Sequence, residues 1–368
     1  MYTTVPILTS YVEYLGASHK MAGLIVGMYG LIQMIVRLPL GIISDRYQKH
    51  KIFIIFGLMF SVLSGLGILV TNHLSWILFL RALAGAAAAT WVDFSVLFTR
   101  YFSKEQTSRA IGTLSSCSTI GQMLGILSGG WIAEKFSWES SFLLGAFVGL
   151  IGLIGAFYIV EKKHECVTNT IDVKKIVNLS KNKTLLSVSL LSVIFQLLIF
   201  ATVFGFTPVY AQSLHASKFD LGLLTFFSAF SAALASWFGG TVLIQRFGEK
   251  KVLLIGLIMI SVFTIAIPFT GSVSVLIFTQ ALSGIGRGLV APILMSLSIM
   301  HIPLFLRSTA MGIYQSIYSF GMFIGPLFMG IISDFFSLRQ GFIILGIVGF
   351  FLVRLAHVLL RFQVVTNK

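Results

Sequence analysis

Long apolar runs separated by short polar turns dominate the chain. The runs are about 20 residues or longer, which a helix needs to cross a hydrocarbon core about 30 Å thick at 1.5 Å per residue. Strands of a membrane barrel would be about ten residues long with alternating polarity, and the sequence lacks that pattern. We therefore predict an all-α integral membrane protein with twelve transmembrane helices, at residues 3–17, 20–44, 51–70, 74–99, 108–132, 139–160, 184–212, 219–243, 251–270, 273–300, 308–333 and 340–361.

A polar segment divides these helices into two groups of six. Residues 162–183 (KKHECVTNTIDVKKIVNLSKNK) form the only long charged stretch of the sequence. Such a stretch between apolar runs is typical of a linker. We predict an N-terminal six-helix bundle at 1–160, a cytoplasmic linker at 161–183 and a C-terminal six-helix bundle at 184–368.

The first predicted helix is incomplete. Only about a dozen uncharged residues precede Glu13, and twelve helical residues rise about 18 Å, which is too short to cross a bilayer. Either the sequence lacks its native N-terminal half-helix, or this segment re-enters the membrane. We favour truncation. The segment has no basic start, so it is not a cleavable signal peptide.

Composition and charge support a membrane location. Hydrophobic residues make up 57% of the chain and charged residues 10%, against about 25% charged in a soluble domain. The net charge of +14 does not indicate nucleic-acid binding, because no basic domain stands outside the membrane. Of the 26 Lys and Arg residues, 18 fall in the turns and tails on the side of the linker and only four on the other side. The positive-inside rule therefore places the linker and the C-terminus in the cytoplasm of a multi-pass plasma-membrane protein.

The sequence gives no support for enzymatic chemistry. Cys117 and Cys166 fall in a helix and in the linker, where we expect neither a disulfide nor a metal site. A phosphate-binding glycine loop, a metal-spaced histidine pair and a Ser-His-Asp order are also missing from the sequence. We therefore predict no enzyme, no cofactor and no metal.

A segment of the N-terminal half recurs in the C-terminal half. Residues 108–146 recur without a gap as residues 308–346, and 12 of the 39 positions are identical at an offset of 200. The basic turn that begins at Arg46 also meets a basic turn at Arg246. An apolar chain that repeats itself once at half-length is typical of a transporter whose site lies between its two halves.

Three motifs resemble those of the major facilitator superfamily. Residues 41–51 (GIISDRYQKHK) resemble the family pattern G-x-x-x-D-R-x-G-R-[RK]-[RK], with Gln48 in place of the usual glycine. Arg81-x-x-x-Gly85 resembles an R-x-x-x-G motif on the fourth helix. Residues 121–130 (GQMLGILSGG) resemble the G-x-x-x-G-P-x-x-G-G motif of antiporters, although Ile126 replaces the proline.

The resemblance implies a drug:proton antiporter-like fold. It implies two six-helix bundles related by a pseudo-two-fold axis, which rock about a midplane site lined by helices one, four, seven and ten. It also implies that Asp45 meets the N-terminus of the eleventh helix near Ser308 as a cytoplasmic latch. A solvated, topogenic basic loop is the alternative. Our gating candidates are Gly41, Asp45, Arg46, Lys49, Lys51, Gly121, Gly125, Gly321, Gly325 and Pro326, and ordinary tight helix packing is the alternative for the glycines.

Charged residues inside the predicted helices are the candidates for coupling, because ionisable groups in a membrane are costly. Setting aside the ends of the helices and Glu13 in the short first segment, Asp93 is the only acid among them, and Arg37 lies at a similar depth, about 11 Å from the cytoplasmic end. They form either a structural ion pair, or Asp93 is a protonatable residue whose partner changes between states. Arg81 is a third proton-coupling candidate, and snorkelling is its alternative. Arg354 is expected to snorkel to the cytoplasm, and Glu13, His19 and the other histidines to lie at the membrane interface.

Arg287 stands near the middle of the tenth helix, and no acid lies deep in the C-terminal half to pair with it. It suggests a cavity for an anionic substrate or a link to Asp93, whereas hydrogen bonds to carbonyls freed near Pro292 are the structural alternative. Gln196 and Gln122 complete our substrate-binding candidates.

The function favoured by the sequence is proton-coupled efflux of an amphipathic small molecule by a monomer in the lipid bilayer. The alternative is proton-coupled uptake of a small organic anion. A third reading is a non-transporting membrane sensor or an inactive truncated relative.

Overall fold

Helices make up 87% of the chain, and no strand occurs among the residues described below. The computed structural model describes residues 1–47, 49–102, 106–161, 179, 181–300, 302–303 and 306–365. Most of the predicted linker falls outside these ranges, so the domain boundaries at 160/161 and 183/184 stay predictions.

The N-terminal half contains seven labelled helices. They are α1 (Leu8–Tyr14), α2 (His19–Tyr47), α3 (His50–Leu69), α4 (Leu74–Ala89), α5 (Trp91–Thr99), α6 (Thr107–Lys135) and α7 (Trp138–Phe157). The predicted fourth span is continuous in the sequence but is interrupted at Thr90, whose hydroxyl donates to the Ala87 carbonyl at 2.7 Å.

The described helices of the C-terminal half include two π-helical turns. Its helices are α9 (Lys183–Ala201), η2 (Thr202–Phe206), α10 (Thr207–Ser213), α11 (Lys218–Phe238), η3 (Gly239–Leu243), α12 (Ile244–Phe247), α13 (Glu249–Ala266), η4 (Ile267–Phe269), α14 (Val273–Ile299), α15 (Arg307–Phe335) and α16 (Leu338–Val365). The π-helical turn η2 precedes Pro208. Proline has no N–H to donate, and a π-turn is one way a helix accommodates that loss.

Within the residues that the structure describes, eleven helical segments are long and apolar enough to cross a membrane. They match eleven of the twelve predicted spans. The predicted first span is the exception, because residues 2–7 form turns and only Leu8–Tyr14 is helical. This helix, α1, is seven residues long.

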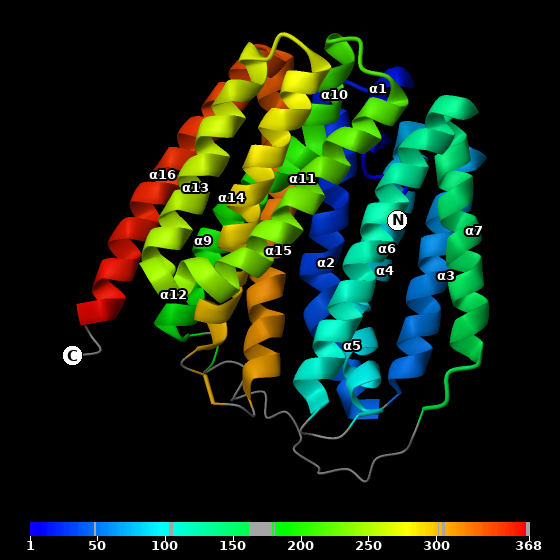
Figure 1. Ribbon diagram of the computed structural model, residues 1–368. Coiled ribbons are helices and arrows are strands. Elements are labelled where there is room, and N and C mark those ends of the chain that lie inside the picture. Colours follow the sequence, from blue (N-terminus) through cyan, green and yellow to red (C-terminus); the bar gives the residue numbers. More distant parts are fainter. Residues whose placement is uncertain are drawn as a thin grey trace.

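The helices form two bundles that stand side by side (Figure 1). The linker side is the end where α2 finishes at Tyr47 and α9 begins at Lys183, and it lies at the bottom of Figure 1. The opposite end is called the far side. Across the boundary between the bundles, α2 packs along α15 and α6 packs along α11.

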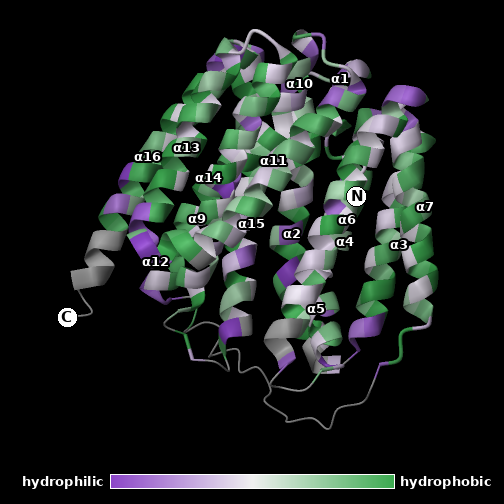
Figure 2. Cartoon of the chain, in the orientation of Figure 1, coloured by the Kyte–Doolittle hydropathy of each residue, from purple (hydrophilic) through white to green (hydrophobic). Residues whose placement is uncertain are grey.

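We expect lipid to surround the outer surface of the protein. Large apolar side chains are exposed along the outer helices, as at Phe147, Ile151 and Phe351. Figure 2 shows apolar residues along the helices and hydrophilic residues gathered towards their ends. A soluble protein rarely exposes so much contiguous apolar surface.

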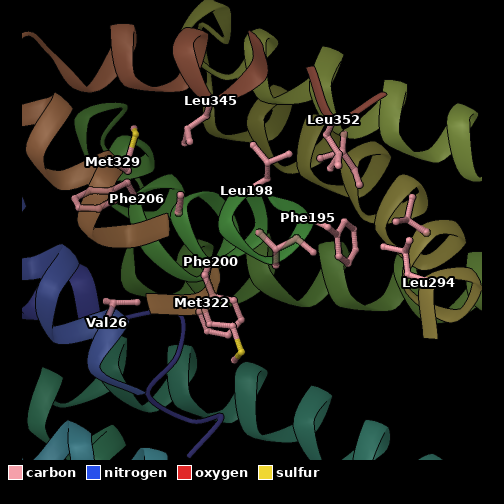
Figure 3. Packing of buried hydrophobic residues seen from close by; sticks show 14 of the residues in the cluster. Val26, Phe195, Leu198, Phe200, Phe206, Leu294, Met322, Met329, Leu345 and Leu352 are labelled. Carbon is pink, nitrogen blue, oxygen red and sulfur yellow. The ribbon is translucent and has the colours of Figure 1, made fainter. Parts of the chain in front are cut away.

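One large apolar cluster extends through both bundles. Figure 3 shows part of it, with Phe200 of α9 beside Met322 of α15, and Phe195 and Leu198 of α9 further along the same cluster. Val26 of α2 belongs to the same cluster and comes from the other bundle. Apolar packing therefore continues across the boundary between the bundles.

Candidate functional site

Glycines bring the two bundles into backbone contact near the far side. A methyl group on Gly23 of α2 would overlap the carbonyl oxygen of Pro326 on α15, and one on Gly330 would overlap the carbonyl oxygen of His19. Gly130 of α6 and Gly222 of α11 face each other across the same boundary. Glycine permits this approach because it lacks a Cβ atom. The bundles are therefore closed against each other on the far side.

Two carboxylates add polar contacts to this closure. Asp334, at the end of α15, accepts hydrogen bonds from the backbone N–H groups of His19 and Lys20 in α2, both at 3.0 Å. Glu134, at the end of α6, accepts from the backbone N–H of Lys218 in α11 at 2.8 Å. Each carboxylate meets the N-terminus of a helix in the other bundle, where the unpaired N–H groups and the helix dipole favour negative charge.

The bundles separate towards the linker side. Near the linker end of α6, Ile111, Gly112 and Ser115 are exposed, and nothing stands near the Cβ position of Gly112. Along the other seam, the Cβ position of Gly312 on α15 still approaches Leu38 of α2 at 3.9 Å. Contact near the far side and separation near the linker side leave an opening between the bundles that widens towards the linker.

A cavity of about 730 Å³ lies between the bundles. Such a volume suits a drug-sized ligand. Both predicted glutamines, Gln196 and Gln122, line it. Its aromatic lining consists of Tyr2, Tyr29, Trp91, Phe94, Phe195, Phe200, Phe204 and Tyr318. The aromatic walls suit a compound with a large apolar part.

Three arginines line this cavity, whereas its described lining contains no aspartate or glutamate. Arg37 donates from Nη2 to Oε1 of Gln33 at 2.5 Å, and the guanidinium of Arg81 stands 4.6 Å from the ring centroid of Tyr29. Arg287 donates from Nη2 to the carbonyl oxygen of Ser228 at 2.9 Å. The sequence suggested a cavity at Arg287, and Arg287 lines the cavity. The structural alternative named the wrong carbonyl, because the acceptor lies on α11 and not near Pro292.

Asp93 pairs with a residue that the sequence did not suggest. Its Oδ1 atom lies 2.8 Å from Nδ1 of His50, and both side chains are fully buried. Arg37 hydrogen-bonds Gln33 instead, so the predicted Arg37–Asp93 ion pair is not formed among the described side chains. His50 is the first residue of α3, and its side chain is fully buried, so it does not face solvent. Asp93 is absent from the described cavity lining, and it joins α5 to α3 within one bundle.

The predicted gating glycines lie mainly inside the bundles. Gly321 and Gly325 of α15 contact the backbone of α9 at Val193 and Leu197. Gly125 of α6 approaches residues 2 and 3, and Gly121 has nothing near its Cβ position. These contacts are the close helix packing named above as the alternative. Pro326, in contrast, lies on the boundary between the bundles, against Gly23.

The basic turn after α2 is described only in part. The Lys51 ammonium donates to the carbonyl oxygen of Phe157 at 2.8 Å, and Lys49 is exposed. The side chains of Asp45, Arg46 and Ser308 lie outside the described residues. The latch proposed between Asp45 and the eleventh helix therefore stays a prediction.

Two signals in the sequence could have revealed residues that were missed. Glu134 and Asp334 occupy equivalent positions in the repeat, at the offset of 200 that also relates Gly130 to Gly330. Tyr29, Gln33 and Arg37 recur at four-residue spacing, which places them on one face of α2. The partnership of His50 and Asp93 has no comparable signal, because 43 residues separate them.

Comparison with known proteins points to one family. A sequence profile of the Major Facilitator Superfamily matches residues 1–240 and 188–367. An uncharacterised MFS-type transporter of Methanocaldococcus jannaschii is 25% identical over 349 residues, which cover 91% of this chain and 88% of that protein. The "Multi-drug resistance efflux pump PmrA homolog" of Lactococcus lactis is 26% identical, covering 92% and 86%.

The fold is also known from solved structures. A bacterial homologue of the human lysosomal transporter Spinster, solved in an inward-facing and occupied conformation, superposes with a TM-score of 0.80. It is 16% identical, and the match covers 98% of this chain and 93% of that one. At this identity the likeness shows a shared fold.

Proposed function

Because the chain belongs to the Major Facilitator Superfamily and is a multi-pass membrane transporter, we propose that it exports an amphipathic small molecule in exchange for protons. The observation that carries this proposal is the cavity between the bundles. A site between two halves that can rock against each other is the arrangement that alternating access requires. The transporter acts on a small-molecule substrate from within the bilayer, and we propose that it works as a monomer.

The conformation supports entry from the linker side. The far side is closed by the glycine contacts and by the Asp334 and Glu134 carboxylates, while the opening widens towards the linker. The excess of Lys and Arg on the linker side indicates that this side faces the cytoplasm, with the protein in the plasma membrane. A substrate that enters there and leaves at the far side is exported. The efflux-pump name of the Lactococcus lactis relative supports the same direction.

Proton coupling is assigned to Asp93. It is fully buried and lies within hydrogen-bond distance of the imidazole of His50. Proton binding to this pair would change the charge that holds α5 against α3. Since α5 continues the helix that carries Arg81, such a change reaches the cavity wall. Arg37 and Arg81 remain proposed partners in coupling through their positions on that wall.

Uptake of a small organic anion with protons is the second candidate. Arg287 favours it, because this arginine lies in the cavity on the C-terminal bundle and its described partner is a neutral carbonyl. An anion entering from the far side would meet it at mid-depth.

Proton movement in proteoliposomes tests the direction. Vesicles that contain a pH-sensitive dye would receive 2-naphthalenesulfonate, 2-naphthalenesulfonamide or (2-naphthylmethyl)trimethylammonium, which share a ring and differ in charge. Antiport predicts proton flow opposite to an amphipathic member of the series, and symport predicts flow in the same direction. If no member moves protons faster than in protein-free vesicles, coupled transport is wrong and the non-transporting reading is favoured.

A further inference from the structure

One face of α2 forms a continuous polar wall of the cavity. Tyr29, Gln33 and Arg37 stand four residues apart and all line the cavity. Arg81 reaches the same wall from α4, with its guanidinium over the Tyr29 ring. Two positive charges therefore lie on one wall, held in place by an aromatic ring and by an amide oxygen.

Several hydrogen-bond donors on this wall have no partner among the described residues. They are Nε and Nη1 of Arg37 and Nε of Arg81, and Gln33 shares the wall with them. The three side chains are only 7%, 8% and 2% exposed, respectively. An arginine cannot lose its charge in a protein, and a buried donor without a partner is costly. The wall is therefore built to receive acceptor atoms that bear negative charge.

No acid of the N-terminal bundle stands among the described residues that line the cavity. Asp93 contacts His50 and is absent from the described cavity lining, and Glu13 contacts His19 near the far side. Across the cavity Arg287 adds a third positive charge. A cationic compound would be repelled by all three arginines, whereas an anion would find a guanidinium from each bundle.

We infer that Arg37, Gln33 and Arg81 form an anion-binding wall, and that the transported compound is an aromatic amphipath with one anionic group such as a carboxylate or sulfonate. Its ring would lie against Phe195 and Phe200 of α9, of which Phe200 stacks on Tyr29 with 6.3 Å between the ring centroids, and its anionic group would lie against this wall. The inference rests on the proposed function, because it names the substrate class of the same cavity. It selects the class of compound and leaves the direction of transport open.

Binding of the matched naphthalene series to the purified protein in lipid nanodiscs tests the inference. 2-Naphthalenesulfonate stays ionised at every working pH, so its charge does not depend on titration. We expect it to bind about tenfold or more tighter than the neutral sulfonamide, because hydrogen bonds to a charged group are the stronger ones. The trimethylammonium compound is expected to bind more weakly than both. Equal binding of the three, tighter binding of the cation, or no binding of the sulfonate would overturn the inference.

Substitutions locate the binding to the wall. Arg37→Gln and Arg81→Gln should each weaken sulfonate binding about tenfold and leave sulfonamide binding unchanged. Arg81→Lys keeps the charge and should restore part of the affinity even if Arg81→Gln folds poorly. Arg354→Gln is the matched control, since it removes an exposed arginine that does not line the cavity. Loss of sulfonate binding in the control but not in the wall variants would contradict the assignment.

The outcomes also separate this inference from the proposed function. If the sulfonate binds at the wall but no compound moves protons in proteoliposomes, the anion site stands and coupled export fails. If the cation or the neutral compound moves protons and binds as tightly as the sulfonate, coupled transport stands and the anion site fails.

Discussion

Glu134 and Asp334 occupy equivalent positions of the internal repeat, and each carboxylate meets the first residues of a helix in the opposite bundle. Asp334 crosses from the C-terminal bundle to α2, and Glu134 crosses from the N-terminal bundle to α11. The repeat therefore produces two related contacts that close the same side. Since both contacts break when the bundles part, they stabilise only the conformation that is closed on the far side.

Removing both carboxylates should favour opening of the far side. Each exposed carboxylate at a helix N-terminus contributes about 0.3–1 kcal/mol, so Glu134→Gln with Asp334→Asn should shift the equilibrium by about fivefold. Spin labels at Phe136 and His215 report the far side, and labels at Gly112 and Phe247 report the linker side. Distance measurements between the labels should show a longer population at the far side and a shorter one at the linker side.

Glu139→Gln is the control for this pair. Glu139 lies in the first turn of its own helix, α7, on the same side of the molecule. Its removal should leave both distance distributions unchanged. If the control and the double variant behave alike, the contacts between the bundles do not set the equilibrium.

A methyl group at Gly330 should hinder closure of the far side. In Gly330→Ala the new Cβ atom would meet the His19 carbonyl oxygen, and overpacking of this kind costs about 1–3 kcal/mol. Transport should slow by about tenfold, since that cost falls on one conformation of the cycle. Gly155→Ala is the matched control because its Cβ position is open. Equal rates for both variants in proteoliposomes would show that the backbone contact is dispensable.

Asp93 should contribute to both stability and coupling. Asp93→Ala removes the carboxylate from a fully buried pair, and breaking a buried pair costs about 3–5 kcal/mol, so thermal unfolding should occur well below the wild-type temperature. Asp93→Asn keeps an oxygen acceptor for the imidazole and should unfold closer to the wild type. The coupling proposal predicts that Asp93→Asn exchanges substrate but does not accumulate it with a proton gradient. Normal proton-driven accumulation would exclude Asp93 as the coupling residue.

Arg287 should matter for transport more than for folding. Its one described hydrogen bond ends on the Ser228 carbonyl within the same bundle, so Arg287→Gln should lower the free energy of unfolding by only about 1 kcal/mol. Flux of 2-naphthalenesulfonate should fall by about tenfold or more, and Arg287→Lys should retain part of it. A variant that transports at the wild-type rate would remove Arg287 from the site.

The sequence predicts the fold well because the bilayer constrains it strongly. A span must be long, apolar and helical to satisfy its backbone, so apolar runs identify eleven of the spans. The break at Thr90 and the π-turn η2 lie inside continuous apolar runs and leave little trace in hydropathy. Pro208 was the available signal for η2, since a proline within a span disturbs helical hydrogen bonding.

The site was predicted in part for a similar reason. A charged residue inside a span stands out, and Arg37, Arg81 and Arg287 all line the cavity. Which groups they contact depends on how helices rotate and pack, which a single sequence does not specify. The sequence suggested Arg37 as the partner of Asp93, whereas Asp93 pairs with His50, the first residue of α3.

Counterflow of radiolabelled 2-naphthalenesulfonate tests the central claim most directly, because it requires only a binding site that alternates between the two sides. Proteoliposomes loaded with unlabelled sulfonate would be diluted into a trace of labelled sulfonate without a proton gradient. The account predicts transient accumulation of label above the outside concentration, absent in protein-free vesicles and lost in Arg81→Gln. Label that never exceeds the protein-free level, in vesicles whose protein is folded, would contradict alternating access of an anionic amphipath through this cavity.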